Sequence, residues 1–313
     1  MKCLFLPKER FSVIAAASLL LIVIFNLTFF EKEKVVSKEN FVYGVTLYKK
    51  TLPVLKEGVS FPTVSAKSVF AIDMTSGRML FEKMPDRPHL PASTTKMITA
   101  LVSLDYYPQD MVLEVGNLNI DGQKMNLFYG EKMRVKDLLY GLLVHSANDA
   151  AEVLAQNYPG GREMFVFSMN HKARELGLDN TYFVNPQGFD GEGQKTSARD
   201  LARVAVYLMQ NPVTAEMVGT KEVEVTSIDG LNSHQLVNIN KLIGEVDGVM
   251  GVKTGWTENA QENLVTYVER DGIKVIIALL SSQNRFDDTK AIIDWIFENY
   301  EWKEIDYPYV LSN

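Results

Sequence analysis

The sequence predicts an α+β fold in which an antiparallel sheet carries helices on its faces. Three observations lead to this prediction. Two strand-like runs flank a glycine-containing turn in residues 68–83, helix-type patterns dominate residues 93–212, and short β-type runs fill residues 221–282. A last helical pattern, residues 287–300, closes the domain, and neither an internal repeat nor a low-complexity tract interrupts this order.

The first half of the domain contains clear turn and helix signals. The runs "SVFAIDM" and "RMLFEK" on either side of "TSG" predict a hairpin over residues 68–83. A helix is predicted over residues 93–104, because the residues after Lys96, 97–104, are apolar nearly all the way round, which is typical of a helix buried inside a domain. Residues 146–148 are predicted to form a turn between two helical runs, residues 135–144 and 149–158.

The second half begins with two further helices. Residues 161–178 predict an amphipathic helix, and "NPQG" predicts the turn that follows it. The next helix is expected to begin with Ser197 as its N-cap and to end before Pro212. The strands expected after it are "KEVEVTS", "QLVNIN", "NLVTYVERDG" and "IKVIIALLSS".

Composition excludes several classes of function. The chain has 313 residues, is 46% hydrophobic and carries a net charge of −7 without a long run of one sign, so nothing indicates nucleic-acid binding. Cys3 is the only cysteine, so the rest of the chain has no disulfide and no cysteine nucleophile or metal site. Metal-ligand spacing is also absent among the histidines, which are His89, His145, His171 and His234.

The N-terminus predicts attachment to a membrane. Residues 11–30 are twenty residues without a charge, long enough for one helix to cross the ~30 Å hydrocarbon core. Lys2, Lys8 and Arg10 precede this transmembrane signal anchor, so residues 1–10 are expected in the cytoplasm and the rest outside. A cleaved signal peptide is the competing interpretation, although the segment ends in bulky residues where a peptidase needs small ones.

Three short motifs are more informative in their order than singly. Ser93 and Lys96 form the only Ser-x-x-Lys, residues 146–148 form Ser-Ala-Asn, and residues 253–255 form the only Lys-Thr-Gly. Each motif alone also has an ordinary interpretation. Ser-x-x-Lys fits a helix-capping serine followed by a surface lysine, and Lys-Thr-Gly fits a β-turn. Ser-x-Asn occurs three times in the chain, so a single match carries little information. In this order the three motifs match the motif series of penicillin-recognising serine enzymes.

Ser93 and Lys96 predict a nucleophile and its general base. At i, i+3 on one helix face the amine reaches the hydroxyl, which is a poor nucleophile until a base takes its proton. Burial and a second cation such as Lys253 favour the neutral amine. The backbone N–H of Ser93 is expected to be half of an oxyanion hole. Ser146 is expected to relay a proton to the leaving amine, and Asn148 to hold the substrate amide and the Lys96 amine.

The third motif predicts recognition of a peptide C-terminus. Lys253 and Thr254 offer a cation and a hydroxyl to a free carboxylate. Gly255 leaves room for substrate backbone at the edge of a strand. The backbone N–H of Trp256 is expected to complete the oxyanion hole, and its ring to form a wall of the pocket.

At these residues the sequence resembles the serine-type D-alanyl-D-alanine carboxypeptidases, the low-molecular-weight penicillin-binding proteins. The resemblance implies the penicillin-recognising serine transferase/β-lactamase-like fold, with a helical subdomain. It also implies an acyl-enzyme on Ser93, a peptidoglycan stem peptide ending in D-Ala-D-Ala as substrate, β-lactams as covalent inhibitors, and no cofactor or metal. The similar segments, within roughly residues 66–300, are "AIDMTSGRMLFEK", "PASTTKMITALV", "LLVHSANDAAEVLA", "ELGLDNTYFVNPQGF", "TSARDLARVA", "GVMGVKTGWTENA" and "RFDDTKAIIDWIFENY".

The resemblance also sets the expected domain organisation. A stalk, residues 31–63, leads to the D,D-peptidase catalytic domain, residues 64–300, and to a C-terminal tail, residues 301–313. Many relatives continue into a β-rich domain and an amphipathic anchor, so the N-terminal segment is expected to supply the attachment here. A second departure is Gln261, where the family usually has glycine. Its side chain is expected to narrow the site beside the sheet edge.

Three alternatives stand beside the carboxypeptidase. A class A β-lactamase needs a glutamate that activates the deacylating water, and the nearest candidate is Glu175 in "ELGLDN", one residue out of register. A D,D-transpeptidase would pass the same acyl-enzyme to an amine, which the sequence does not exclude. A non-catalytic wall-binding relative would have no need for the intact set of Ser93, Lys96, Ser146, Asn148 and Lys253.

Several nearby residues have structural interpretations. Asp149 is expected to be an acid at a helix start, favoured by the helix dipole, and His145 a hydrogen-bonded residue beside the site. Trp295 and Trp302 are expected to be packing residues. Arg285 has two interpretations: it helps to bind the terminal carboxylate of the substrate, or it forms a surface ion pair with an aspartate at 287–288.

Overall fold

The computed structural model describes residues 46–309. Residues 51–304 form one compact unit, and the described residues on either side of this range belong to a second one. The predicted anchor, residues 11–30, lies outside the described residues and stays a prediction. Within the described part of the chain, no helix has the length and apolar character that crossing a membrane requires.

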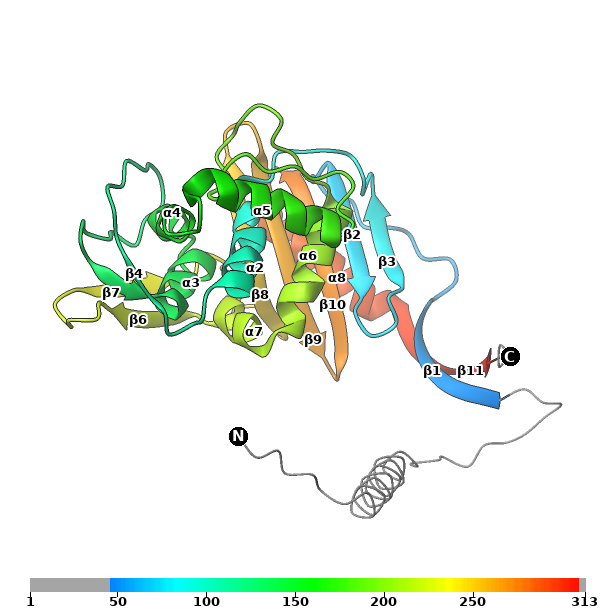
Figure 1. Cartoon of the computed structure of the whole chain (residues 1–313). Helices are drawn as coiled ribbons and strands as arrows, with labels where there is room; N and C mark the ends of the chain where they lie inside the picture. Colours follow the sequence, from blue (N-terminus) through cyan, green and yellow to red (C-terminus); the bar gives the residue numbers. More distant parts are fainter. Residues whose placement is uncertain (1–45, 310–313) are drawn as a thin grey trace, which may run out of the picture. The chain divides into compact units, whose positions relative to one another are not determined.

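The centre of the compact unit is a five-stranded antiparallel sheet with the strand order β3-β2-β10-β9-β8 (Figure 1). The predicted hairpin forms β2 and β3, and the predicted α+β class is confirmed. The strands are β2 (Ser68–Asp73), β3 (Met79–Lys83), β8 (Val249–Thr257), β9 (Gln261–Arg270) and β10 (Ile273–Ser282).

The middle strand β10 is buried on both faces and separates two hydrophobic cores. Successive side chains of a strand point to opposite faces of its sheet. Ile276 and Ala278 accordingly belong to the larger core, whereas Ile277 and Leu279 belong to the smaller one. The unbroken apolar run of β10 therefore reflects a strand covered by other elements on both sides.

Helices cover both faces of the sheet (Figure 1). Helix α8 (Arg285–Asn299) packs on β9 and β10 from one side, and α6 (Ala198–Gln210) packs on β2 and β10 from the other. The predicted apolar helix is α2 (Lys96–Tyr106), which contacts α3, α5 and α6 and is preceded by the short 3-10 helix η1 (Ala92–Thr95). The core thus surrounds the helix that begins with Lys96.

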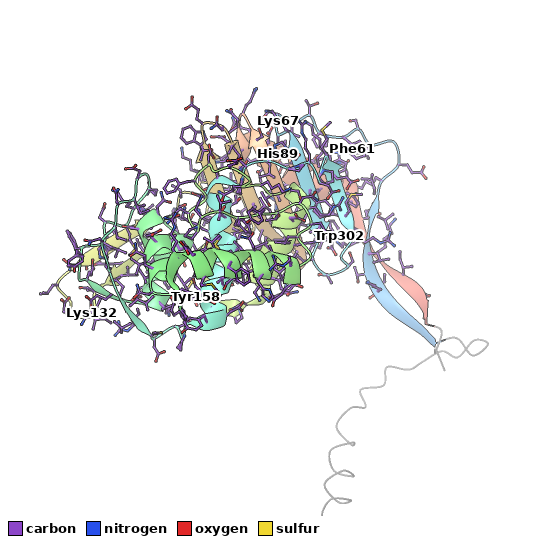
Figure 2. All side chains as sticks on the ribbon, turned by 45° about the horizontal axis from the view of Figure 1, so that its top comes forward. Phe61, Lys67, His89, Lys132, Tyr158 and Trp302 are labelled. Atoms are coloured by element: carbon purple, nitrogen blue, oxygen red, sulfur yellow. The ribbon has the colours of Figure 1, made fainter. Side chains whose placement is uncertain are left out.

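A helical subdomain lies beside the sheet, as the fold class predicts. In Figure 2, Lys132 lies in this subdomain at one end of the compact unit, and Phe61 and Trp302 lie at the opposite end. Two short antiparallel hairpins, β4–β5 and β6–β7, belong to it and do not join the central sheet. The elements of the subdomain are α3 (Val135–Leu143), α4 (Asn148–Gln156), α5 (Gly161–Glu175), β4 (Val112–Glu114), β5 (Lys132–Arg134), β6 (Glu222–Thr226) and β7 (Ser233–Val237).

Two local expectations differ from the structure. Pro212 does not only follow a helix, because it also starts another one, α7 (Pro212–Gly219). Asn211 caps α7 by accepting a hydrogen bond from the backbone of Val213, and proline is well tolerated in a first turn. Strands β1 (Thr46–Leu55) and β11 (Tyr300–Tyr309) pair with each other, although the sequence indicated a stalk and a tail there.

Candidate active site

The first motif lies where η1 passes into α2, at the edge of β8. Ser93 belongs to η1, and Lys96 is the first residue of α2. A Cβ added to Gly255 in β8 would lie 3.0 Å from the backbone nitrogen of Ser93. A Cβ added to Gly188 would lie 1.9 Å from the carbonyl oxygen of Ala92. Glycine at both positions therefore lets two segments pack against the backbone around Ser93.

The amine of Lys96 contacts three oxygen atoms. Its Nζ lies 2.9 Å from Ser93 Oγ, 2.7 Å from Asn148 Oδ1 and 2.8 Å from the carbonyl oxygen of Gln187. A neutral amine has two N–H donors and one lone pair, and the Asn148 and Gln187 oxygens only accept hydrogen bonds. These two oxygens therefore occupy both N–H donors. The remaining lone pair faces the Ser93 hydroxyl.

The surroundings of Lys96 favour this neutral form. Its exposed fraction is 0%, so the alternative of a surface lysine is wrong. Burial, and then the positive charge of Lys253, hold the pKa of the Lys96 amine well below its usual range. The carboxylate of Asp149 acts in the opposite direction without cancelling the effect.

The second motif bridges the two lysines. Ser146 lies between α3 and α4 with a left-handed φ of 60°, and its Oγ accepts a 2.8 Å hydrogen bond from Lys253 Nζ. Asn148 is the first residue of α4. Its Oδ1 accepts from Lys96, and its Nδ2 donates a 2.8 Å hydrogen bond to the carbonyl oxygen of Asp121. Ser146 and Asn148 thus each hold one lysine.

The third motif lies in strand β8, so the alternative of a β-turn is wrong. Lys253 and Thr254 are buried, whereas the Trp256 side chain is 63% exposed. Burial, followed by the positive charge of Arg285, lowers the pKa of Lys253 to about 7. The strand therefore places an easily deprotonated amine beside Ser146.

These residues surround one cavity of about 350 Å³. Lys96 and Lys253 lie beneath its surface, hydrogen-bonded to Ser93 and Ser146 respectively. The other six predicted site residues line it directly. The complete lining is Ser93, Gly122, Gln123, Ser146, Asn148, Gln187, Gly188, Phe189, Ile239, Thr254, Gly255, Trp256, Thr257 and Arg285.

Sequence reasoning missed the residues that support Lys96 from α4 and from the "NPQG" turn. Gln187 offers its carbonyl oxygen to Lys96, and its Nε2 donates a 2.5 Å hydrogen bond to Glu152 Oε2. Glu152 is buried in α4, one helical turn after Asn148. The one available signal was this i, i+4 spacing, which places Asn148 and Glu152 on the same helix face.

Arg285 lies in the wall of the cavity, whereas Gln261 lies outside it. Arg285 lines the cavity, and its Nη1 donates a 3.1 Å hydrogen bond to the carbonyl oxygen of Gly255. Among the described residues it has no ion pair with an aspartate at 287–288. Gln261 has a left-handed φ of 61°, its exposed side chain donates to the carbonyl oxygen of Glu258, and it does not line the cavity. Its effect is on the backbone and not on the width of the site.

The other residues singled out in the sequence make hydrogen bonds, ion pairs or packing contacts within the fold. His145 lies 2.6 Å from Gln123 through Nε2 and 3.1 Å from the carbonyl oxygen of Val237 through Nδ1. Asp149 accepts hydrogen bonds from three successive backbone nitrogens, residues 125–127. Glu175 ends α5, pairs with Lys172 and His171, and does not line the cavity. Trp295 is buried in the smaller core, and Trp302 packs against that core.

Comparison with known proteins finds similar proteins over most of the chain. The family described as D-alanyl-D-alanine carboxypeptidase matches residues 56–284. Among solved structures, the DD-transpeptidase of Streptomyces K15 superposes with a TM-score of 0.73 at 30% identity, covering 77% of this chain and 100% of that one. The D-alanyl-D-alanine carboxypeptidase of Mycobacterium tuberculosis H37Rv gives 0.73 at 30% identity, covering 78% and 96%.

The chain belongs to this D-alanyl-D-alanine carboxypeptidase family. A curated relative, the D-alanyl-D-alanine carboxypeptidase DacF of Bacillus subtilis strain 168, is 32% identical over 246 residues. The aligned region covers 75% of this chain and 63% of that relative, so the chain spans less than two thirds of its length. The predicted resemblance to this family and the predicted penicillin-recognising fold are confirmed.

Proposed function

We propose that the chain is a serine-type D-Ala-D-Ala carboxypeptidase that removes the terminal D-alanine from peptidoglycan stem pentapeptides. The observation that carries the proposal is the set of contacts around Lys96. A buried amine with a lowered pKa lies 2.9 Å from the Ser93 hydroxyl, and two other acceptors hold its N–H groups. Family membership supports the class of substrate.

Acylation begins with proton transfer from Ser93 to Lys96. The lone pair of the Lys96 amine takes the hydroxyl proton, and Ser93 Oγ attacks the carbonyl carbon of the penultimate D-alanine. The negative charge that develops on the carbonyl oxygen is stabilised by the backbone N–H groups of Ser93 and Trp256. The ammonium formed on Lys96 donates to all three of its oxygen neighbours, so the site suits the amine before and after the transfer.

Loss of D-alanine requires a proton on the leaving nitrogen. As the C–N bond breaks, Ser146 gives its hydroxyl proton to that nitrogen and takes one from the Lys253 ammonium, 2.8 Å away. The site therefore holds one ammonium charge before and after the step, first on Lys253 and then on Lys96. A pKa of about 7 makes Lys253 a suitable proton donor near neutral pH.

Substrate binding uses the remaining predicted residues. Thr254 and Arg285 line the cavity and offer a hydroxyl and a cation to the terminal carboxylate, with Lys253 beneath them. Asn148 is placed to hold the substrate amide in addition to Lys96. Gly255 keeps the strand edge free of a side chain, and the exposed ring of Trp256 forms a wall of the cavity.

Hydrolysis of the acyl-enzyme completes the reaction. A water molecule occupies the position of the departed amine. It loses a proton through Ser146 to the neutral amine of Lys253 and attacks the acyl carbon. Ser93 Oγ then leaves and takes a proton from the Lys96 ammonium, which restores the neutral amine of Lys96 and the ammonium of Lys253. A D,D-transpeptidase, in which an amine replaces this water, is the second candidate, because a structural neighbour bears that description. Glu175, the nearest candidate for the glutamate that a class A β-lactamase needs, does not line the cavity.

The decisive experiment compares the wild type with Ser93→Ala on a D-Ala-D-Ala-terminated peptide. We expect the wild type to release D-alanine in stoichiometric excess and to bind a fluorescent penicillin covalently. Ser93→Ala should lose both activities and keep its circular dichroism spectrum. Cross-linked product would identify a transferase, and neither product nor labelling would identify a non-catalytic wall-binding protein. Undiminished labelling of Ser93→Ala would mean that another residue is the nucleophile.

The place of action proposed for the enzyme is the outer side of the cell membrane. Residues 11–30 are uncharged and follow three basic residues, which supports a single-pass anchor with the catalytic domain on the cell-wall side. Fractionation of cells that express the full chain tests this. The chain is expected in the membrane fraction, and a protease added to spheroplasts should degrade its catalytic domain.

A further inference from the structure

A second cavity, about 490 Å³, lies in the helical subdomain between β7 and the loop before β5. We call it the β7 groove. Its walls come from two segments that are about a hundred residues apart in the chain, together with His145. The lining residues are Lys124, Met125, Asn126, Phe128, His145, Leu231, Asn232, Ser233, His234 and Gln235.

The β7 groove adjoins the active-site cavity. His145 lines the groove, and its neighbour Ser146 lines the cavity. Gln123, also in the cavity wall, lies 2.6 Å from His145 through its Nε2. Beyond the end of β7, Ile239 lines the cavity as well. A molecule that occupies the active site therefore reaches the groove by passing His145.

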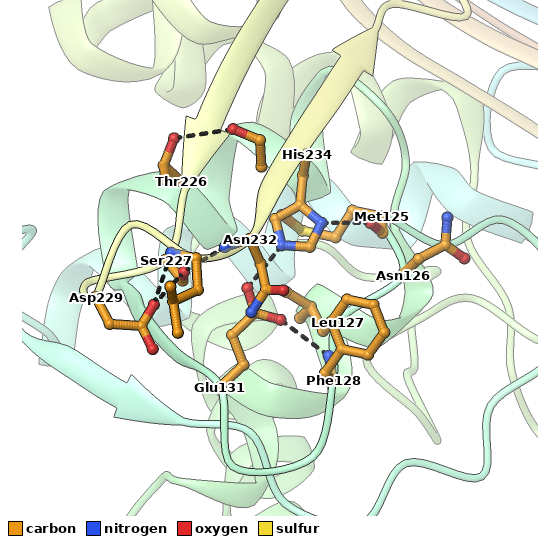
Figure 3. Close-up of polar contacts among 12 residues, drawn as sticks. Met125, Asn126, Leu127, Phe128, Glu131, Thr226, Ser227, Asp229, Asn232 and His234 are labelled. Carbon is orange, nitrogen blue, oxygen red and sulfur yellow. Dashed lines mark hydrogen bonds and ion pairs between the residues drawn. The ribbon is translucent and has the colours of Figure 1, made fainter.

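The walls of the groove are joined by buried polar contacts (Figure 3). His234 contacts the carbonyl oxygen of Met125 through Nδ1 at 2.8 Å and Glu131 Oε1 through Nε2 at 2.7 Å. The other oxygen of Glu131 accepts a 2.9 Å hydrogen bond from the backbone of Phe128. Asp149 holds the backbone nitrogens of residues 125–127. The groove is thus preformed, as binding sites for small ligands usually are.

The accessible surface of the groove combines an aromatic ring with amide groups. Phe128 is 59% exposed, although its backbone is held. The side-chain amides of Asn126 and Asn232 make no hydrogen bond within the described residues, so their donors and acceptors are available. An aromatic face packs against the C–H face of a sugar ring, and amides match hydroxyl and N-acetyl groups. Lys124 is the only charged side chain of fixed sign in the lining.

We propose that the β7 groove binds the glycan part of the substrate, the N-acetylated amino sugar to which the stem peptide is attached. This inference rests on the proposed function. The sugar is joined to the N-terminal end of the stem peptide, and four extended residues span at most about 14 Å. Because the groove begins one residue from Ser146, a chain of this length is suited to connect the two sites. The enzyme then recognises both ends of the stem peptide.

The test compares two soluble substrates that carry the same pentapeptide, one free and one attached to its disaccharide. We expect the full-length wild type in detergent to show about tenfold higher kcat/KM for D-alanine release from the glycosylated substrate, equivalent to one good additional contact. Phe128→Ala and Asn232→Ala should each reduce this preference to threefold or less and leave the free peptide unchanged. Equal kcat/KM for both substrates in the wild type would overturn the proposal.

A matched control is the neighbouring residue Tyr129. It is also aromatic, is 76% exposed and does not line the groove, so Tyr129→Ala should keep the wild-type preference. If Phe128→Ala slows both substrates equally, the groove binds peptide and the proposal is wrong. If neither substrate releases D-alanine, the proposed function fails. Saturation-transfer NMR with the free disaccharide then decides the groove separately: contact in the wild type but not in Phe128→Ala supports it, and no contact refutes it.

Discussion

Replacement of Asn148 by alanine tests the role of the buried amine most directly. The change removes one of the three oxygen atoms around Lys96, the one at 2.7 Å. A hydrogen bond to a group that becomes charged contributes about 1.5–3 kcal/mol. Because Lys96 gains its charge during acylation, the rate constant for acylation should fall about 10- to 150-fold. The measurement is the second-order rate constant for labelling by a fluorescent penicillin, with D-alanine release in parallel.

Asn148→Asp is the matched control for this prediction. It keeps an acceptor oxygen but places a negative charge beside the amine, which raises the pKa of Lys96. Because acylation needs the neutral amine, the acid limb of the rate profile should move to higher pH in this variant. Asn148→Ala adds no charge and should show no comparable displacement. A labelling rate for Asn148→Ala within threefold of the wild type, or identical pH profiles for both variants, would refute a base at Lys96.

Three further predictions concern β8 and its turn. Gln261→Gly should raise the melting temperature by about 2–4 °C, because a left-handed φ costs a non-glycine residue about 1–2 kcal/mol, partly offset by the entropy that glycine loses on folding. The value of kcat/KM should not change. An equal rise in Gln261→Ala would exclude backbone strain as the cause. Gly255→Ala brings a Cβ to 3.0 Å from the Ser93 nitrogen, so penicillin labelling should slow about tenfold, and an unchanged rate would contradict the close packing. Lys253 has a pKa of about 7 when folded and a higher one when unfolded. The unfolded state therefore binds more protons between these values, and Lys253 should make the free energy of unfolding rise by about 2 kcal/mol from pH 7 to pH 9. Urea titrations of Lys253→Met should show a smaller rise than the wild type.

Local rules were sufficient for much of the fold. The predicted hairpin, the buried helix after Ser93 and the cap at Ser197 depend on contacts within a few residues of each other, and the structure contains all three. Local rules did not reveal that α6 is succeeded directly by another helix. Pro212 was expected only to terminate a helix, yet the same residue is favourable in the first turn of the next one, and the capping side chain of Asn211 makes that start possible.

Pairing between distant segments lay beyond these rules. Strands β1 and β11 come from the two ends of the described chain. The sequence of β11 alternates polar and apolar residues with one change of phase between Lys303 and Glu304, whereas β1 shows no such period, and neither sequence indicates that the two strands pair. The hairpin β6–β7 was expected as strand, but nothing local separates a strand of the central sheet from one of an independent pair. In each case the partner decides, because a strand is stabilised by cross-strand contacts more than by its own residues.

By itself, the sequence determined which groups are available for chemistry. Ser93 and Lys96 are three residues apart on one helical turn, so their contact follows from helix geometry alone. Only the tertiary structure decided the state of that lysine. The oxygens that occupy its N–H groups belong to Asn148 and Gln187, 52 and 91 residues further along the chain, and neither they nor full burial can be derived from local periodicity. A base needs a desolvated, correctly oriented lone pair, and that property arises only when distant segments pack around the amine.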